Sequence, residues 1–237
     1  MSSNSFCVVI PMFNEEGNAN KCIQAISGFL SKIDGNTGLI VVDDGSIDKT
    51  NAILKEIIGS YKNVFLEEHK INQGYGAANV TGAKRAMKEN YKYALFMDAD
   101  LTQNPNYIFS FIEFMEKDVD YIKATRYSKG GNVVGVSFKR WIISKIGNIM
   151  AKLFLRLPIS DYTNGFRAVK CSILAQIKAE ERGFAYLIEE VYKVSKLAKT
   201  YAEVPYTLTV RDGAFSESKF TYSPRVYLKY LKWLFKK

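Results

Sequence analysis

The sequence predicts an α/β fold in which helices cover both faces of a mainly parallel central sheet. In the first half of the chain, short apolar runs rich in β-branched residues alternate with stretches whose apolar residues recur at helical spacing. This alternation is typical of right-handed strand–helix–strand crossovers. Acidic residues follow three of the apolar runs within five residues, and ligands bind beyond the carboxyl ends of such strands.

Five apolar runs are expected to be strands, and the amphipathic stretches between them are expected to be helices. The strands are FCVVI (6–10), LIVV (39–42), VFL (64–66), YALFM (93–97) and a weaker YIKA (121–124). The helices are 15–30, 47–58, 77–88 and 107–115, and Ser46 is a suitable N-cap for the second of them.

Two basic amphipathic helices are expected in the second half. Residues 138–157 place apolar side chains at helical spacing among lysines and arginines, which is as consistent with a core or dimer-packing helix as with membrane contact. Residues 223–237 repeat the pattern, and Trp233 there is a candidate anchor in a membrane interface. No apolar run approaches the roughly 20 residues that cross a bilayer, and the first residues do not resemble a signal peptide.

Composition limits the functions that the chain can have. Its 237 residues suffice for one α/β domain, and 33 Lys and Arg against 24 Asp and Glu give a net charge of +9. This excess suits nucleic acid, an anionic membrane or a phosphorylated substrate. Three widely spaced cysteines indicate reduced, packed thiols in a cytosolic setting. His69 is the only histidine, so a metal would be held mostly by oxygen, which favours Mg²⁺ or Mn²⁺.

Three acidic clusters are expected at one edge of the sheet. They follow the first, second and fourth strands as PMFNE (11–15), DDGS (43–46) and DAD (98–100). Carboxylates this close repel one another and lose hydration unless a cation lies near them. The pattern therefore predicts a divalent cation shared with a phosphate-bearing ligand. The glycines within 74–76 follow the third strand rather than the first, which argues against a dinucleotide-binding fingerprint.

The order of the motifs points to a family. VIPMFNEE (9–16), VVDDGSIDKT (41–50), NQGYG (72–76) and DAD (98–100) together resemble glycosyltransferase family 2, whose members have the Rossmann-like, nucleotide-sugar-binding GT-A fold. RY (126–127), RW (140–141) and LPISDYTNGFR (157–167) resemble one branch, the dolichol-phosphate mannose synthases and bacterial polyprenyl-phosphate glycosyltransferases. Asn164 replaces the Ser or Thr usual in that branch, and Phe13 replaces the common Tyr.

The resemblance implies a domain organisation and roles for individual residues. One GT-A domain would span 1–221, with a nucleotide-sugar half (1–125) and an acceptor half (126–221), followed by a basic membrane-contacting helix (222–237). Asp98 and Asp100 would hold Mg²⁺ or Mn²⁺ with the donor diphosphate. The implied donor-binding residues are Pro11, Phe13, Glu15, Asp43, Asp44 and Gly74. The implied cations for the acceptor phosphate are Arg126, Arg167, Arg211 and Lys219, with Arg167 the strongest candidate because its context is apolar.

The acceptor half favours a phosphate as the attacking group. A hydroxyl acceptor needs a general base, and the segment before Arg140 has neither a carboxylate nor the Gln that other branches carry there. A phosphate monoester has a second pKa of about 6 and is already largely dianionic at neutral pH. The leading hypothesis is therefore inverting transfer from a GDP- or UDP-sugar to a dolichyl or undecaprenyl phosphate, at the cytoplasmic face of a membrane.

Two alternatives accompany this hypothesis. A family 2 enzyme acting on a saccharide hydroxyl would need a base such as Asp161, Glu189 or Glu190. A non-catalytic basic module would bind nucleic acid or a membrane partner, but a nucleic-acid surface would not gather four aspartates, so no nucleic-acid partner is expected. A membrane-protein partner and a homo-oligomer are both left open.

Overall fold

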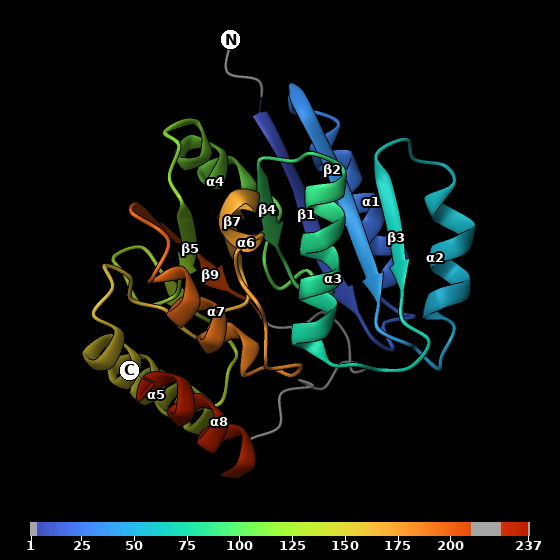
Figure 1. The fold of residues 1–237 in the computed structure, drawn as a ribbon. Coiled ribbons are helices and arrows are strands. Elements are labelled where there is room, and N and C mark those ends of the chain that lie inside the picture. The colour runs from blue at the N-terminus through green and yellow to red at the C-terminus, as the bar shows by residue number, and fades with distance from the viewer. Residues whose placement is uncertain (1–3, 210–223, 237) are drawn as a thin grey trace.

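The computed structural model describes residues 4–209 and 224–236, and a seven-stranded sheet forms its centre (Figure 1). The strands are β1 (Asn4–Met12), β2 (Gly35–Asp43), β3 (Val64–Glu68), β4 (Tyr93–Phe96), β5 (Tyr121–Thr125), β7 (Arg167–Lys170) and β8 (Tyr201–Pro205). Their order is β3-β2-β1-β4-β7-β5-β8, and every neighbouring pair is parallel except the two that include β7. A separate pair joins β6 (Asn132–Val133) to β9 (Thr207–Leu208) in parallel.

Helices cover both faces of the sheet. One face carries α1 (Ala19–Leu30), α2 (Thr50–Ile58) and α4 (Tyr107–Glu116), and the other carries α3 (Tyr75–Lys88), α6 (Cys171–Leu174) and α7 (Tyr186–Val194). The remaining helices, α5 (Phe138–Leu155) and α8 (Pro224–Leu234), contact each other near the end of the sheet at which β1 and β2 finish (Figure 1).

Alternation along the strands divides the core into two layers. In β1, Val8 and Ile10 pack into the cluster under α1 and α4, whereas Cys7 and Val9 pack into the cluster under α3 and α7. Because both faces are covered, the strands are continuous apolar runs rather than alternating ones. The cysteines are buried and unpaired, as predicted; the cytosolic setting stays a prediction.

The expected α/β architecture is confirmed, with two local corrections. The antiparallel strand β7 was not predicted, because its sequence RAVK has a charged residue at each end and no apolar run. Ser46 is not the N-cap of α2: the helix begins at Thr50, and the Ser46 hydroxyl instead accepts a hydrogen bond from the backbone N–H of Asn14 at 2.9 Å. The Asp48 carboxylate accepts the N–H of Thr50 at 2.9 Å.

The basic helix at the C-terminal end packs on the domain. Trp233, the candidate interface anchor, is fully buried against Tyr192 of α7, and its indole N–H lies 3.4 Å from Glu181 Oε1. Trp233 therefore anchors α8 to the protein rather than to a membrane. In the described part of the chain, no helix is both long enough and apolar enough to cross a bilayer.

Candidate active site

A cavity of about 1370 Å³ lies at the carboxyl ends of β1, β2 and β4. Its walls include five of the six residues expected to bind the donor, namely Pro11, Phe13, Glu15, Asp44 and Gly74. Both aspartates of the DAD motif line it as well. The parallel strands therefore deliver their acidic ends to one space, as their common direction requires.

Asp44 is held by the segment that follows β3. Its Oδ1 accepts the backbone N–H of Gln73 at 2.9 Å, and its Oδ2 accepts that of Gly74 at 2.8 Å. His69 Nδ1 lies 2.6 Å from the same Oδ1. Gly74 has a φ of +101°, and a Cβ there would lie 2.6 Å from the carbonyl oxygen of Arg182. Glycine is thus required at this position by backbone conformation and by space.

Asp43 has a different environment from that of Asp44. Its Oδ1 accepts the N–H of Ser46 at 3.1 Å, and its Oδ2 accepts from Asn51 Nδ2 at 2.7 Å. The side chain is 2% exposed and is not among the residues that line the cavity. This placement opposes the expected donor contact: Asp43 fixes the turn between β2 and α2.

The two aspartates after β4 are oriented by neighbours within five residues. Gln103 Nε2 donates to Asp98 Oδ2 at 2.7 Å, and the Asp98 N–H returns a bond to Gln103 Oε1 at 3.0 Å. Asp100 Oδ1 accepts both the N–H and the hydroxyl of Thr102, at 3.1 and 2.8 Å. Thr102 and Gln103 were not anticipated as site residues. The available signal was the polar pair Thr102-Gln103, which follows DAD (98–100) after one intervening residue.

The residues present fit a divalent cation held jointly with a ligand. In residues 4–209 and 224–236, no three His, Cys, Asp or Glu side chains gather closely enough to form a complete metal site. Mg²⁺ is usually bound through one or two carboxylates together with substrate phosphates rather than by a cage of protein groups. Asp98 and Asp100 supply two such carboxylates at the wall of one cavity, and the donors are oxygens only, which suits Mg²⁺ and Mn²⁺.

Arg126 lines the cavity and is paired with Asp161. Arg126 Nε and Nη2 donate to the two carboxylate oxygens of Asp161 at 2.7 and 2.9 Å. The pKa of Arg126 is raised above its usual value, because the adjacent Asp161 carboxylate outweighs the lowering effect of burial. Asp161 is fully buried and is not among the lining residues. With both oxygens engaged by a permanent cation, it is a poor general base.

Arg167 does not reach the cavity. Its guanidinium is fully buried and pairs with Glu190, while Nη1 donates to the carbonyl of Gly165 and Nη2 to Asn79. The expected contact with an acceptor phosphate therefore does not fit the structure. An arginine in an apolar context has two explanations, a ligand contact or a buried ion pair, and Glu190 supplies the second. Arg211 and Lys219 lie outside the described residues.

Glu189 and Glu190 are not placed to act as bases either. Glu189 accepts the backbone N–H groups of Glu180 and Glu181 at 2.6 and 2.7 Å and is paired with Lys193. Glu190 is paired with Arg167. Both are fully buried and lie outside the cavity lining. Among the described lining residues, the carboxylates are Glu15, Asp44, Asp98 and Asp100, all at the expected donor end.

The part of the lining that comes from α5, α7 and α8 is mainly apolar. It includes Ile143 and Met150 of α5, Leu187 of α7, and Tyr230 and Leu231 of α8. The exposed faces of α5 and α8, together with Phe235 directly after α8, carry apolar side chains beside lysines. The apolar ones are Ile146, Ile149, Leu153, Phe154, Leu228 and Phe235, and the lysines are Lys145, Lys152 and Lys229. These nine residues are called the α5/α8 surface below.

Comparison with known sequences identifies relatives over most of the chain. The family model described as Glycosyl transferase family 2 matches residues 7–178. The polyprenol monophosphomannose synthase of Mycolicibacterium smegmatis is 26% identical over 230 residues, which cover 95% of this chain and 85% of that protein. The dolichol-phosphate mannosyltransferase of Pyrococcus furiosus is 30% identical over 232 residues, and the chain spans 95% of its own length but 63% of that relative.

Solved structures share the fold. Glucosyl-3-phosphoglycerate synthase from Mycobacterium tuberculosis, in complex with phosphoglyceric acid, superposes with a TM-score of 0.69 at 17% identity, over 98% of this chain and 79% of that one. The complex of that enzyme with Mn²⁺, uridine diphosphate and glucosyl-3-phosphoglycerate gives 0.64 at 19% identity, over 90% and 73%. The expected GT-A fold is thereby confirmed.

Proposed function

The chain belongs to glycosyltransferase family 2, and from this premise we propose that it transfers a sugar from a GDP- or UDP-sugar to a polyprenyl phosphate, with inversion at the anomeric carbon. The names of two relatives, one a polyprenol monophosphomannose synthase and the other a dolichol-phosphate mannosyltransferase, support this acceptor class. One observation carries the proposal: a single cavity is lined both by carboxylates that follow β1, β2 and β4 and by apolar side chains of α5, α7 and α8.

The carboxylate-lined part of the cavity is the proposed donor site. Asp98 and Asp100 would hold Mg²⁺ or Mn²⁺, which would neutralise charge on the departing nucleoside diphosphate. Gln103 and Thr102 keep the two carboxylates oriented through the bonds described above. Phe13 offers a ring on which a base or ribose can stack. A solved structure of the same fold with Mn²⁺ and uridine diphosphate supports this assignment.

The apolar part of the cavity is the proposed acceptor site. A hydroxyl acceptor would require a base there, yet the described carboxylates of the acceptor half that could serve, Asp161, Glu189 and Glu190, are all held in ion pairs. A phosphate monoester needs no base. Arg126 lines the cavity and is proposed to position the acceptor phosphate. The apolar part of the lining would contact the first isoprene units.

The α5/α8 surface is the proposed membrane contact. Exposed apolar side chains can enter the boundary between headgroups and acyl chains, and lysines near an anionic bilayer contribute about 1 kcal/mol each. The same two helices contribute to the apolar part of the cavity lining. A lipid acceptor could therefore pass from the bilayer into the site. The proposed attachment is peripheral, at the cytoplasmic face of the membrane. In this proposal the chain consists of a donor half (1–125), an acceptor half (126–221) and a C-terminal helix that contacts the membrane (222–237).

Lipid-linked product formation tests the function. The full chain is incubated with Mn²⁺, a short polyprenyl phosphate and, in separate reactions, labelled GDP- and UDP-linked hexoses, and the organic phase is assayed. We expect a labelled, acid-labile lipid from at least one donor, and none with Asp100→Asn. No lipid product from any donor, while free saccharides are glycosylated, would refute the acceptor assignment.

A further inference from the structure

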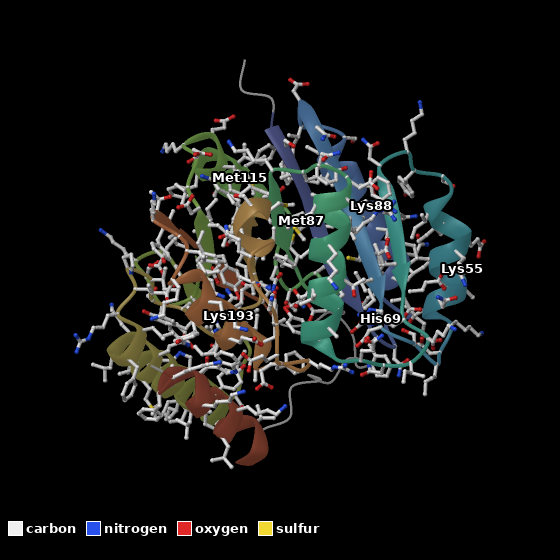
Figure 2. All side chains as sticks on the ribbon, in the orientation of Figure 1. Lys55, His69, Met87, Lys88, Met115 and Lys193 are labelled. Atoms are coloured by element: carbon white, nitrogen blue, oxygen red, sulfur yellow. The ribbon has the colours of Figure 1, made fainter. Side chains whose placement is uncertain are left out.

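We propose that His69 is a positioning residue that orients Asp44 to accept the ring N–H of the donor's base. The inference rests on the proposed function and concerns the base-binding end of the donor site. His69 follows β3, and Figure 2 shows it beside the lower end of α3, opposite the end that carries Met87 and Lys88. Its side chain is 8% exposed, and that of Asp44 is 4% exposed.

The hydrogen bonds of the imidazole define its tautomer. Nδ1 lies 2.6 Å from Asp44 Oδ1, and Nε2 lies 2.9 Å from Thr81 Oγ1 on α3. An ionised carboxylate only accepts hydrogen bonds, so the proton must be on Nδ1. In the neutral ring, Nε2 then accepts from the hydroxyl of Thr81. The ring is thus fixed at both nitrogens, and it connects α3 to the carboxylate.

Asp44 depends on this segment for its orientation. Its hydrogen bonds come from His69, Gln73 and Gly74, all within the six residues after β3. Among the described residues, no Lys or Arg side chain is paired with Asp44, and His69 is its ion-pair partner if protonated. A backbone N–H is fixed by the fold. Within residues 4–209 and 224–236, the imidazole is the side-chain donor to Asp44, and it adds a third bond to the two that the backbone supplies.

The orientation of a carboxylate matters for base recognition. Uracil presents one ring N–H on its pairing edge, and guanine presents a ring N–H beside an amino group, so a carboxylate in the cavity wall can accept from either. Cytosine presents an unprotonated ring nitrogen at the equivalent position, which a carboxylate would repel. Asp44 lines the cavity with Phe13 and Pro11, so fixing its carboxylate would favour uridine and guanosine donors over cytidine donors.

Four variants separate positioning from a structural role. His69→Ala removes both bonds. His69→Asn retains an amide N–H near the place of Nδ1, whereas His69→Gln places its amide near Nε2 and leaves Asp44 without the donor. Thr81→Val removes only the Nε2 partner. Thermal unfolding of each variant reports whether it folds.

Calorimetric titration with UDP and with GDP, in the presence of Mn²⁺, tests the inference on the full chain. Pyrophosphate with Mn²⁺ is the base-free probe. We expect His69→Ala and His69→Gln to weaken nucleoside diphosphate binding about tenfold, as loss of a hydrogen bond to a charged group should. His69→Asn should recover most of the affinity, and pyrophosphate should bind all variants within about twofold.

Two results would overturn the inference. If wild type binds UDP and GDP and His69→Ala binds them equally well, the positioning role of His69 is refuted, and the proposed function is not affected. An equal loss of pyrophosphate affinity would show that His69 supports the fold of the site instead. If His69→Ala does not fold, the comparison of His69→Asn with His69→Gln decides. Wild-type protein that binds neither nucleotide would refute the proposed function, and this inference with it.

Discussion

The guanidinium of Arg167 and the carboxylate of Glu190 form a two-point ion pair inside the protein, with Nε–Oε1 and Nη2–Oε2 both at 2.6 Å. Both side chains are fully buried. Arg167 also donates to the carbonyl of Gly165, and Lys123 donates to the carbonyl of Asn164 next to it. A buried guanidinium and a buried lysine amine therefore hold consecutive carbonyls of the segment that passes beside Asp98.

The first prediction concerns this pair. Although burial raises the pKa of Glu190, Arg167 outweighs it and lowers that pKa, so the pair is ionised. Glu190→Gln leaves a buried charge uncompensated and should reduce the free energy of unfolding by about 3–5 kcal/mol. Urea titration measures it. The double variant Arg167→Met/Glu190→Leu should recover much of the loss, and a single variant as stable as wild type would contradict the account.

The second prediction concerns the space beside Asp98. A Cβ at Gly165 would lie 2.6 Å from Tyr75 Oη and 3.4 Å from Asp98 Oδ1. Gly165→Ala should therefore displace one of these groups and weaken Mn²⁺-dependent nucleotide binding by about tenfold or more. Tyr75→Phe, which keeps the ring stacked on Phe184, should restore part of the affinity in the Gly165→Ala background. If Tyr75→Phe restores no affinity in the Gly165→Ala background, a clash with the Tyr75 hydroxyl is not the cause of the loss.

The third prediction concerns pH. Burial, followed by the nearby charge of Arg167, lowers the pKa of Lys123 to about 7, whereas a lysine of the unfolded chain titrates near 10.4. Between these values the unfolded state binds more protons, so this group makes the free energy of unfolding rise with pH above about 7. Below a pH of about 7, Lys123 is protonated in the folded protein as well, so this group no longer makes the free energy of unfolding depend on pH.

Lys123→Met tests this dependence, because methionine does not titrate. The stability of wild type minus that of Lys123→Met should increase as the pH is raised from 7 to about 9.5. Lys170→Met is the control variant, because Lys170 forms ion pairs with Asp118 and Asp120 near the surface. A wild-type minus Lys123→Met difference that is flat or falling over this range would contradict the assignment.

The fourth prediction concerns the α5/α8 surface. Leu153 and Leu228 are each 65% exposed, and glutamate at both positions adds negative charge where insertion into an anionic bilayer is proposed. Leu153→Glu/Leu228→Glu should reduce co-sedimentation with vesicles containing phosphatidylglycerol at least several-fold. Ile47→Glu is the matched control, since Ile47 is 88% exposed but outside this surface. Equal losses in both proteins would contradict the proposed contact.

The sequence was sufficient for the parts of the molecule that depend on local pattern. The alternation of strands and helices, and the acidic ends of β1, β2 and β4, follow from residue periodicity and chain direction. Partners that meet through packing were not predictable. Arg167 and Glu190 are 23 residues apart, and nothing local to Arg167 distinguishes a buried ion pair from a ligand contact. His69 likewise finds Asp44 only because β3 lies beside β2.

We propose that Asp98, Asp100 and the donor diphosphate share one divalent cation. The initial rate of sugar transfer to polyprenyl phosphate, measured with Mn²⁺ and with excess EDTA, tests this most directly. We expect EDTA to lower the rate by at least about a hundredfold, added Mn²⁺ to restore it, and Asp100→Asn to be as slow as the chelated wild type. Transfer at the same rate in EDTA would contradict the claim.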